Sequence, residues 1–413
     1  MKHVLVLTGR FLPQMSANGV CINNIIQRLP KSEFQVTCIC YDDTETMQDD
    51  TIKIIRVSRG ILNSFLYRTE KKNSPLVNAL KKAAITGEKI CKIPFLISWP
   101  WSDPFYTRRV YRIAKELYSL TPFDYVIAVH MPISSLIVAD KLKKKFPRIK
   151  YIPYFLDSLS GGRPISLFSE EWNRKKKLDW EKRLLPNADK IVVMESSCAH
   201  HEQYSSSTSY YNKFVYLDIP LLCKPEKKEY KNPFSENDKI IVTFSGAAVQ
   251  PLRNMIFFSE LAKTIHAMDP KIVFYIIGQS NCEKLYDPDY IRYLGPIAHE
   301  NLLPYLDHSD ILLNFGVRVP SAISGKIFEY MAFGKPIIST FSIENEACIP
   351  YLLKYPISLL VEENMDKLEK SAEEMLSFMH TAAGRRVEFA QIKDTFRNNL
   401  PETFIEEIFE KDY

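Results

Sequence analysis

Short apolar runs alternate with amphipathic segments along most of the first half of the chain. HVLVLTG, EFQVTCICYDD and FDYVIAVH are nearly continuous apolar runs, the pattern of parallel strands that are covered on both faces. Between the first two lies VCINNIIQRL, whose apolar residues recur at roughly helical spacing. A strand, a helix and a strand in this order predict the start of a doubly wound parallel sheet.

The same alternation restarts after a polar interruption. Pro, Lys and Asn dominate residues 223–238, which is typical of a linker. Beyond it, KIIVTFSG, KIVFYIIG, DILLNFG and KPIIST have the pattern of strands with helical segments between them. We therefore predict an α/β protein with two Rossmann-like domains, residues 1–222 and 239–390. Residues 391–413 are expected to form a C-terminal helix that packs back on the N-terminal domain.

Two such domains predict where a ligand binds. Open α/β sheets bind ligands beyond the carboxyl ends of their strands. We therefore expect the two domains to face each other across an interdomain cleft that holds the site.

Residues 61–120 depart from the alternation. Lys and Arg interleave there with Leu, Ile, Phe, Trp99 and Trp101. An ordinary pair of amphipathic helices with a solvated basic face would give this pattern. A surface that docks on anionic lipid headgroups, or on a lipid-linked acceptor, would give it too. Both interpretations stay open.

Composition and charge narrow the class of protein. The chain has 413 residues, 46% of them hydrophobic, which suits two or three globular domains. A net charge of +5 without a nucleic-acid-binding motif argues against a nucleic-acid partner. No run approaches the roughly 20 apolar residues of a membrane span. The apolar run near the N-terminus ends at Gly9, Arg10 and Pro13, so it fits a buried strand better than a signal peptide.

The eight cysteines suggest a compartment. They are scattered, and no C-x-x-C spacing of a zinc or redox site occurs. Cys38 and Cys40 would share one face of a strand, where core packing is the simplest explanation. Scattered thiols suit a reducing cytoplasm. We therefore expect a cytoplasmic protein whose membrane contact, if it has one, is peripheral on the inner face of the plasma membrane.

The strongest chemical signal is SGKIFEYMAFGKPIIS, which begins at Ser324. Ser324 is a favoured N-cap residue, and Gly325 lets a ligand approach the backbone. The free amides and the dipole of a helix that starts here would bind a diphosphate, and Lys326 adds a cation. Glu329, one turn further, can accept two hydrogen bonds from a ribose diol. A plain capped helix with an exposed lysine would give the same pattern.

This segment resembles the donor site of glycosyltransferase family 4, the retaining GT-B enzymes also called glycosyl transferases group 1. In that family two glutamates lie eight residues apart, ahead of a Met-Ala-x-Gly-x-Pro run. Glu329 matches the second glutamate, which holds the nucleotide ribose. The first, which contacts the donor sugar, falls on Ser321 and is absent, although relatives with a Ser-x-Lys-x-x-Glu-Tyr form lack it too.

Two loops resemble other parts of the family's donor site. FSGAAVQPLRNM carries Gly246, which allows close approach, and Arg253, which matches a cation that grips the diphosphate. PQMSANGV is similar to the Gly-rich loop whose amides face the donor, and Gly19 is its matching residue. A solvated charge at a helix start explains Arg253 equally, and an ordinary turn explains Gly19.

Two polar residues end apolar strands in the first half. The family places a histidine near the sugar at the position of His130, and an imidazole can donate to a hydroxyl or move a proton. Asp157 ends YIPYFLD and can bind acceptor hydroxyls. The alternatives are a packed imidazole for His130 and an N-cap or loop role for Asp157.

The resemblance implies an enzyme that moves a hexose from a nucleotide diphosphate sugar to a hydroxyl of a sugar or lipid-linked oligosaccharide. The implied setting is cell-surface polysaccharide or glycolipid synthesis, with retention of configuration. We expect no metal, because Asp287-Pro-Asp289 lies in a polar loop rather than at a strand end. The nucleotide sugar is a substrate, and no cofactor is expected.

Other functions of the same fold stay open. A non-catalytic nucleotide-sugar-binding or scaffolding subunit is favoured by the serine at position 321. A nucleotide-sugar epimerase would need acid–base groups, and only His130 and Asp157 are candidates. A dinucleotide oxidoreductase is disfavoured, because no G-x-G-x-x-G follows the first strand.

Overall fold

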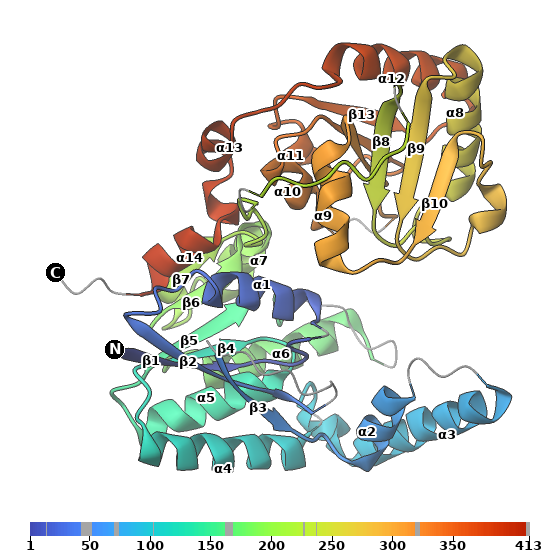
Figure 1. The fold of residues 1–413 in the computed structure, drawn as a ribbon. Coiled ribbons are helices and arrows are strands. Elements are labelled where there is room, and N and C mark those ends of the chain that lie inside the picture. The colour runs from blue at the N-terminus through green and yellow to red at the C-terminus, as the bar shows by residue number, and fades with distance from the viewer. Residues whose placement is uncertain are drawn as a thin grey trace. The chain divides into compact units, whose positions relative to one another are not determined.

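The protein forms two compact units, one made of Met1–Pro220 with Pro401–Tyr413 and the other of Leu221–Leu400 (Figure 1). Each unit is built around one parallel sheet, and this confirms the predicted α/β fold with two Rossmann-like domains. The computed structural model describes residues 1–13, 15–42, 52–69, 74–101, 103–161, 168–225, 228–236, 238–318 and 323–409.

The first unit holds a seven-stranded sheet in the order β3-β2-β1-β4-β5-β6-β7. All neighbouring strands run parallel. The strands are β1 Lys2–Leu7, β2 Phe34–Tyr41, β3 Ile52–Val57, β4 Tyr125–Val129, β5 Lys150–Phe155, β6 Ile191–Met194 and β7 Phe214–Leu217.

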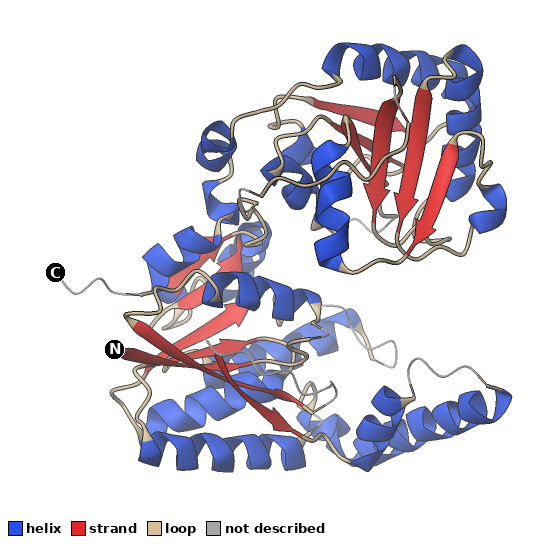
Figure 2. Cartoon of the chain, viewed as in Figure 1, coloured by secondary structure: helices blue, strands red, loops and turns tan. Residues whose placement is uncertain are grey.

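Helices cover both faces of this sheet (Figure 2). Val4 and Val6 of β1 pack in the core that contains α1 and α14, whereas Leu5 and Leu7 face the core that contains α4 and α5. This alternation follows from the two-residue period of a strand. The helices are α1 Ala17–Ile26, α2 Ile61–Arg68, α3 Pro75–Lys92, α4 Pro104–Leu120, α5 Ile133–Lys145, α6 Glu170–Leu184, α7 Cys198–Ser205 and α14 Pro401–Ile408.

The end of the chain returns to the first unit. Helix α14 lies beside α1 (Figure 1), and Phe404 and Ile408 are buried in their shared core. Arg28 and Glu402 form an ion pair of 2.9 Å at its edge. The β1–α1 half of the sheet is thus covered by a segment from the other end of the sequence.

The second unit holds a six-stranded parallel sheet in the order β10-β9-β8-β11-β12-β13. Helices α8 and α12 share a core on one face, and α9, α10, α11 and α13 share a core on the other. The strands are β8 Ile240–Ser245, β9 Ile272–Ile277, β10 Ile291–Gly295, β11 Ile311–Asn314, β12 Ile337–Phe341 and β13 Ser358–Glu362. The helices are α8 Met255–Met268, α9 His299–His308, α10 Lys326–Ala332, α11 Ile349–Leu352, α12 Leu368–Ala382 and α13 Phe389–Thr395.

The strand order reverses once in each sheet, between β1 and β4 and between β8 and β11. At such a reversal the connecting loops leave in opposite directions, and the crevice between them binds ligands in open α/β sheets. His130 follows β4 and Gly246 follows β8, so both lie at these reversal points. Among the helices that the structure describes, none has the length and hydropathy to cross a membrane.

Candidate functional site

The loops after β8 and β9 are joined backbone to backbone. The Gly246 amide donates to the Ile277 carbonyl at 2.8 Å, and Gly246 and Gly278 have φ of 148° and 134°. A Cβ atom on Gly278 would lie 2.0 Å from the Gly246 carbonyl oxygen. Only glycine fits this crossing. The two loops therefore pack closely, with no side chain between them, beside the point where the strand order reverses.

Helix α10 begins one residue later than the N-cap prediction placed it. Gly325 is the N-cap, and it makes no side-chain capping bond. Ser324 is buried, and its amide donates to Sγ of Cys348 at 3.2 Å. The N-cap role predicted for Ser324 is therefore wrong, because a buried contact with Cys348 fixes this residue ahead of the helix. Ser321 lies outside the described residues.

The charged pair of the motif meets in the first turn of α10. Nζ of Lys326 lies 2.7 Å from Oε2 of Glu329. Nδ1 of His299, the first residue of α9, lies 3.6 Å from the other carboxylate oxygen. Both Lys326 and Glu329 keep part of their side chains exposed. The pair explains a lysine in the first turn without a phosphate, and it leaves both charged groups within reach of a ligand.

Arg253 is buried, so the alternative of a solvated charge is wrong. Its guanidinium donates to the Phe315 carbonyl, just beyond β11, and lies 5.3 Å from the centre of the Phe244 ring. Burial lowers the pKa of Arg253, and the nearby Tyr330, Cys348 and two glutamates oppose that shift. An arginine stays protonated even so. The second unit thus holds a buried positive charge between the ends of β8 and β11.

One of those glutamates, Glu346, is a residue that sequence reasoning missed. Its side chain is 2% exposed, and within the described ranges neither carboxylate oxygen has a hydrogen-bond partner. A Cβ atom on Gly316 would lie 2.5 Å from its Oε2, which places the carboxylate against the end of β11. Burial raises the pKa of Glu346 to about 7, nearby Glu363 adds to that rise, and Arg253 opposes it.

Nothing in the sequence separates Glu346 from the exposed Glu344 two residues earlier. Both follow the strand KPIIST in a polar stretch. Only the packing of the loop against β11 buries one of them. Glu346 and Arg253 place a carboxylate and a guanidinium close to Ser324 and Cys348 at the same end of the second sheet.

In the first unit, His130 is buried at the end of β4. Its amide donates to the Tyr154 carbonyl at 2.7 Å, and Asn18 donates to its carbonyl at 2.7 Å. Nδ1 of the imidazole has no partner among the residues described. Burial lowers the pKa of His130 to about 4, with a smaller effect from Lys177. The ring is therefore neutral at pH 7 and can donate or accept one hydrogen bond.

Gly19 lies in the first turns of α1. Its amide donates to the capping hydroxyl of Ser16 at 3.2 Å, and a Cβ atom there would lie 2.4 Å from the Arg10 carbonyl oxygen. The amide is therefore occupied by the cap. Gly19 contributes space for the loop after β1 rather than a free donor.

Asp157 is exposed just beyond β5. The next helix, α6, begins at Glu170, so the alternative of an N-cap role is wrong. No hydrogen-bond or ion-pair partner of Asp157 occurs in the part of the chain that the structure describes. This leaves a loop carboxylate that is open to a ligand.

Two further charged residues of α6 are buried, and the first of them, Lys177, interacts with His130. Lys177 and Glu181 are buried, and Oε1 of Glu181 accepts from the Ser160 amide at 2.9 Å. Burial raises the pKa of Glu181 to about 7, and burial lowers the pKa of Lys177. The charged stretch SEEWNRKKKLDWEKRL hides this pair, since its composition does not show which residues turn inward.

No group of three or more His, Cys, Asp or Glu side chains within the described residues is placed to hold a metal ion. All eight cysteines are free thiols. The polar side chains described above near the two strand-order reversals are cations, carboxylates and one imidazole. Such groups bind anions and hydroxyls.

Comparison with known proteins gives a family. Residues 239–377 match the family "Glycosyl transferases group 1". That span includes Gly246, Arg253, Lys326 and Glu329. No curated protein matches the chain in sequence.

Solved structures give the fold. A glycosyltransferase from Rickettsia africae has a TM-score of 0.61 at 11% identity, covering 98% of this chain and 96% of its own. HepE from Anabaena in complex with UDP has a TM-score of 0.56 at 12% identity, covering 99% and 98%. The UDP-GlcNAc 2-epimerase from Methanocaldococcus jannaschii has a TM-score of 0.54 at 13% identity, covering 98% and 99%.

At such identities these likenesses show the fold alone, and a transferase and an epimerase share it. The sequence match narrows the assignment further. The resemblance predicted from SGKIFEYMAFG is confirmed: residues 239–377 match the glycosyl transferases group 1, and the chain has the two-domain GT-B fold.

Proposed function

We propose that this protein transfers a hexose from a nucleotide diphosphate sugar to a hydroxyl acceptor, with retention of configuration and without a metal. The observation that carries the proposal is the Lys326–Glu329 pair, 2.7 Å apart in the first turn of α10, within the segment that matches the family. A cation and a carboxylate at that spacing suit the two ends of a ribose diphosphate. The ammonium group of Lys326 would donate hydrogen bonds to the phosphate, and the ribose diol would donate to the carboxylate of Glu329.

The second unit would bind the donor. Arg253 would stabilise the negative charge that develops on the departing diphosphate, since a buried cation acts strongly where water is excluded. Gly246 would let the diphosphate approach the end of β8, and Gly325 would do the same at the start of α10. Ser324 would support that helix start through its contact with Cys348. Because HepE was solved with UDP, a uridine nucleotide is the first donor to test.

The first unit would bind the acceptor and assist the transfer. The neutral imidazole of His130 would hydrogen-bond a hydroxyl of the transferred sugar through its unpartnered nitrogen. Asp157 would bind acceptor hydroxyls, and Gly19 would keep the loop after β1 close to the donor.

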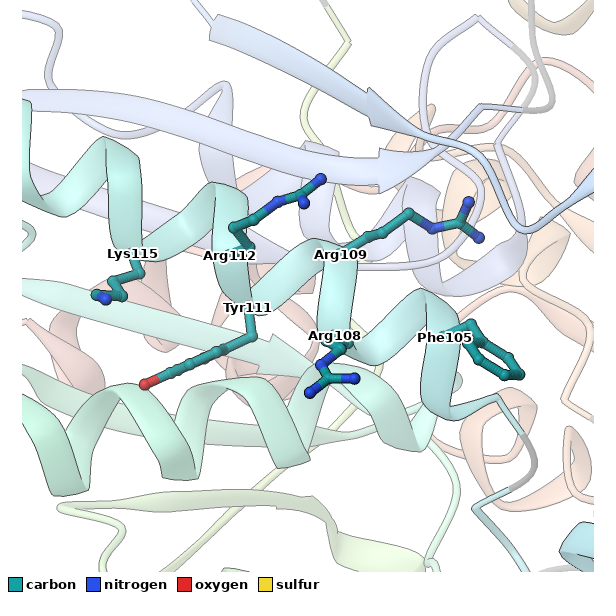
Figure 3. A pocket seen from close by; sticks show the side chains of 6 residues that line it. All are labelled: Phe105, Arg108, Arg109, Tyr111, Arg112 and Lys115. Carbon is teal, nitrogen blue, oxygen red and sulfur yellow. The ribbon is translucent and has the colours of Figure 1, made fainter.

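The acceptor proposal is a sugar or a lipid-linked oligosaccharide of cell-surface polysaccharide or glycolipid synthesis. A lipid-linked acceptor of this kind is anchored in a membrane. We therefore also propose that the protein works in the cytoplasm as a peripheral protein on the inner face of the plasma membrane. Its support is a row of exposed cations on α4, namely Arg108, Arg112 and Lys115, which line the hollow shown in Figure 3.

The decisive experiment is a thermal-shift panel of nucleotide sugars, followed by product analysis. A donor that binds only the folded protein raises its melting temperature. We expect one donor to stabilise the parent and a Glu373→Ala control, whose substituted residue is exposed, but not Glu329→Ala. A Glu329→Ala variant that is stabilised as much as the parent would remove this residue from the site.

Product analysis then separates the rival functions. Sugar transferred to an added acceptor supports the transferase. An isomerised donor would identify an epimerase instead. Donor binding with neither product, in the presence of a membrane lipid extract, would identify a non-catalytic binding subunit.

A further inference from the structure

A buried carboxylate and a buried guanidinium lie near each other in the second unit without a hydrogen bond between them. Glu346 and Arg253 are 2% and 8% exposed. Within the described ranges, both carboxylate oxygens of Glu346 and Nε of Arg253 lack a hydrogen-bond partner. Each group still shifts the pKa of the other, so the two lie within electrostatic reach. Buried polar groups are rarely left in this way, and such an arrangement calls for an explanation.

A second carboxyl group, that of Glu363, lies at the same place. Its Oε1 accepts from the Thr340 hydroxyl at 2.8 Å, and its charge raises the pKa of Glu346, because two buried like charges repel each other. Burial raises the pKa of Glu363 as well, but the hydrogen bond with Thr340 and the charge of Arg318 oppose that rise. Glu346 has no such hydrogen bond, so the proton of this pair goes preferentially to Glu346.

The other titratable groups nearby keep their charge near neutral pH. Cys348, just before α11, and Tyr330 of α10 both influence the pKa of Arg253, and burial raises the pKa of each to about 12. Both groups are therefore neutral, and Arg253 and Arg318 stay protonated. The net charge of this part of the second unit near neutral pH thus depends on the two carboxyl groups, and mainly on Glu346.

Glu346 also lies close to two parts of the proposed donor site. A Cβ atom on Gly316 would lie 2.5 Å from its Oε2, so the carboxylate rests against the end of β11, where a backbone carbonyl holds Arg253. Two residues further, Sγ of Cys348 accepts from the Ser324 amide at 3.2 Å, just ahead of α10. A change of charge at Glu346 is therefore felt both at the arginine and at the helix start.

We propose that binding of the donor diphosphate by the second unit is coupled to the uptake of a proton by Glu346. When Glu346 is ionised, its charge offsets that of Arg253 and repels the diphosphate. When Glu346 is protonated, the full charge of Arg253 acts on the diphosphate, and little water screens it inside the protein. The inference rests on the proposed role of Arg253 in donor binding, and it adds a regulation of that site by pH.

The coupling has a definite sign. The pKa of Glu346 is about 7 in the free protein, and a bound diphosphate would raise it further, because a second anion disfavours the carboxylate. Donor affinity should therefore be highest at low pH and fall as the pH rises through the pKa of the free protein. For a single proton the fall is at most about tenfold per pH unit.

The test is titration calorimetry with UDP-glucose from about pH 5.5 to about pH 8.5, a range that brackets the pKa of Glu346. The diphosphate of this probe is esterified at both ends, so it does not titrate in the range. Each titration is run in PIPES and in imidazole, whose heats of ionisation differ. We expect the parent to bind more weakly as the pH rises, with a buffer-dependent heat near neutral pH that shows proton uptake.

Three variants assign this behaviour to its residue. Glu346→Gln carries no charge at any pH, so its affinity should stay near that of the parent at low pH across the range, without proton uptake. Glu363→Gln removes the repulsion between the carboxyl groups, so the midpoint of its pH profile should move to lower pH. A merely structural role of Glu363 would not move that midpoint. Glu344→Gln changes an exposed acid two residues from Glu346 and should behave like the parent.

The remaining outcomes separate this inference from the proposed function. Donor binding by the parent that is independent of pH would overturn the coupling and leave the transferase proposal in place. A Glu346→Gln variant that binds more weakly than the parent at every pH would overturn it too, since Glu346 would then act in its ionised form. No binding of UDP-glucose or of any other nucleotide sugar at any pH would count against both the coupling and the proposed function.

Discussion

Arg253 is a buried cation whose position is fixed by the fold of the second unit. Its guanidinium is held by the Phe315 carbonyl and the Phe244 ring, so the cation cannot move far from the end of β11. A fixed cation stabilises charge without reorganising when the diphosphate leaves. If Arg253 has the proposed role, its fixed position is what allows it to stabilise the departing diphosphate.

We predict that Arg253→Met weakens binding of the nucleoside diphosphate by about 1–3 kcal/mol, the range of a charge-assisted contact. Methionine keeps much of the buried volume while it removes the charge. The control is Arg385→Met, which changes an exposed arginine. Titration calorimetry gives both affinities. Equal affinities of Arg253→Met and the parent would show that the guanidinium serves packing alone.

Glu346 should make stability depend on pH. Its pKa is raised to about 7 by burial, above the value of the unfolded chain, so the folded state binds the proton more tightly. Stability from such an acid is present below the unfolded pKa and is lost as the pH rises through the folded pKa. The loss for Glu346 alone should be about 2–3 kcal/mol between pH 4.5 and 7, by the linkage of pKa and free energy.

Glu346→Gln should therefore flatten the fall in unfolding free energy between these pH values. Urea unfolding of the second unit at both pH values measures it. Glu344→Gln, two residues away and exposed, is the control and should keep the slope of the parent. Identical slopes in all three proteins would mean that Glu346 titrates as an ordinary acid.

At the scale of elements, apolar runs in the sequence predict the strands well. The sequence does not predict which charged residues are buried. Continuous apolar runs such as HVLVLTG and KIVFYIIG correspond to the buried strands β1 and β9. A strand that is covered on both faces needs apolar residues at every position, so its sequence is easily identified. Glu181 and Lys177 turn inward from a helix whose composition is that of a solvated surface. Which side faces the sheet is decided by tertiary packing, and a single sequence does not carry that information.

In the candidate site, too, some contacts follow from local sequence and others depend on tertiary packing. Lys326 and Glu329 are three residues apart, so their meeting on one helix face follows from the sequence. His299 reaches Glu329 from another element, and Glu346 and Arg253 come together from loops after different strands. Local spacing predicted the first pair. The other contacts depend on strand order, which a local pattern does not give.

The crossing of the loops after β8 and β9 gives a prediction at this scale. Gly278→Ala should destabilise the second unit by about 3 kcal/mol or more, because the new Cβ would collide with the Gly246 carbonyl as well as strain the backbone. Gly295→Ala is the matched control. Its φ is also positive, at 69°, but nothing lies within 4 Å of the new Cβ, so backbone strain of about 1 kcal/mol is expected alone.

Thermal unfolding of both variants tests this reasoning. Gly278→Ala should have the lower melting temperature and should also bind the donor more weakly, since the loop at Gly246 must shift. Equal melting temperatures of the two variants would show that the loops move apart at little cost.

At the scale of the whole molecule, the return of the chain to its first unit matters most. Helix α14 buries Phe404 against Tyr154 of β5, with ring centres 5.1 Å apart, and against the core of α1. The two units also have separate hydrophobic cores. A change in α14 should therefore act on the unit that begins the sequence rather than on the one that precedes α14 in the chain.

We predict that Phe404→Ala costs the first unit about 3–5 kcal/mol, the usual range for a buried phenyl ring. Hydrogen exchange followed by mass spectrometry should then show faster exchange in peptides of β1, β4, β5 and α1, and unchanged exchange in peptides of β8 to β13. Phe105→Ala, which removes an exposed ring from the same unit, is the control and should leave both sets unchanged. If exchange in both units accelerated together in Phe404→Ala, the protein would unfold as one cooperative body, and the division of its stability along the two cores would be wrong.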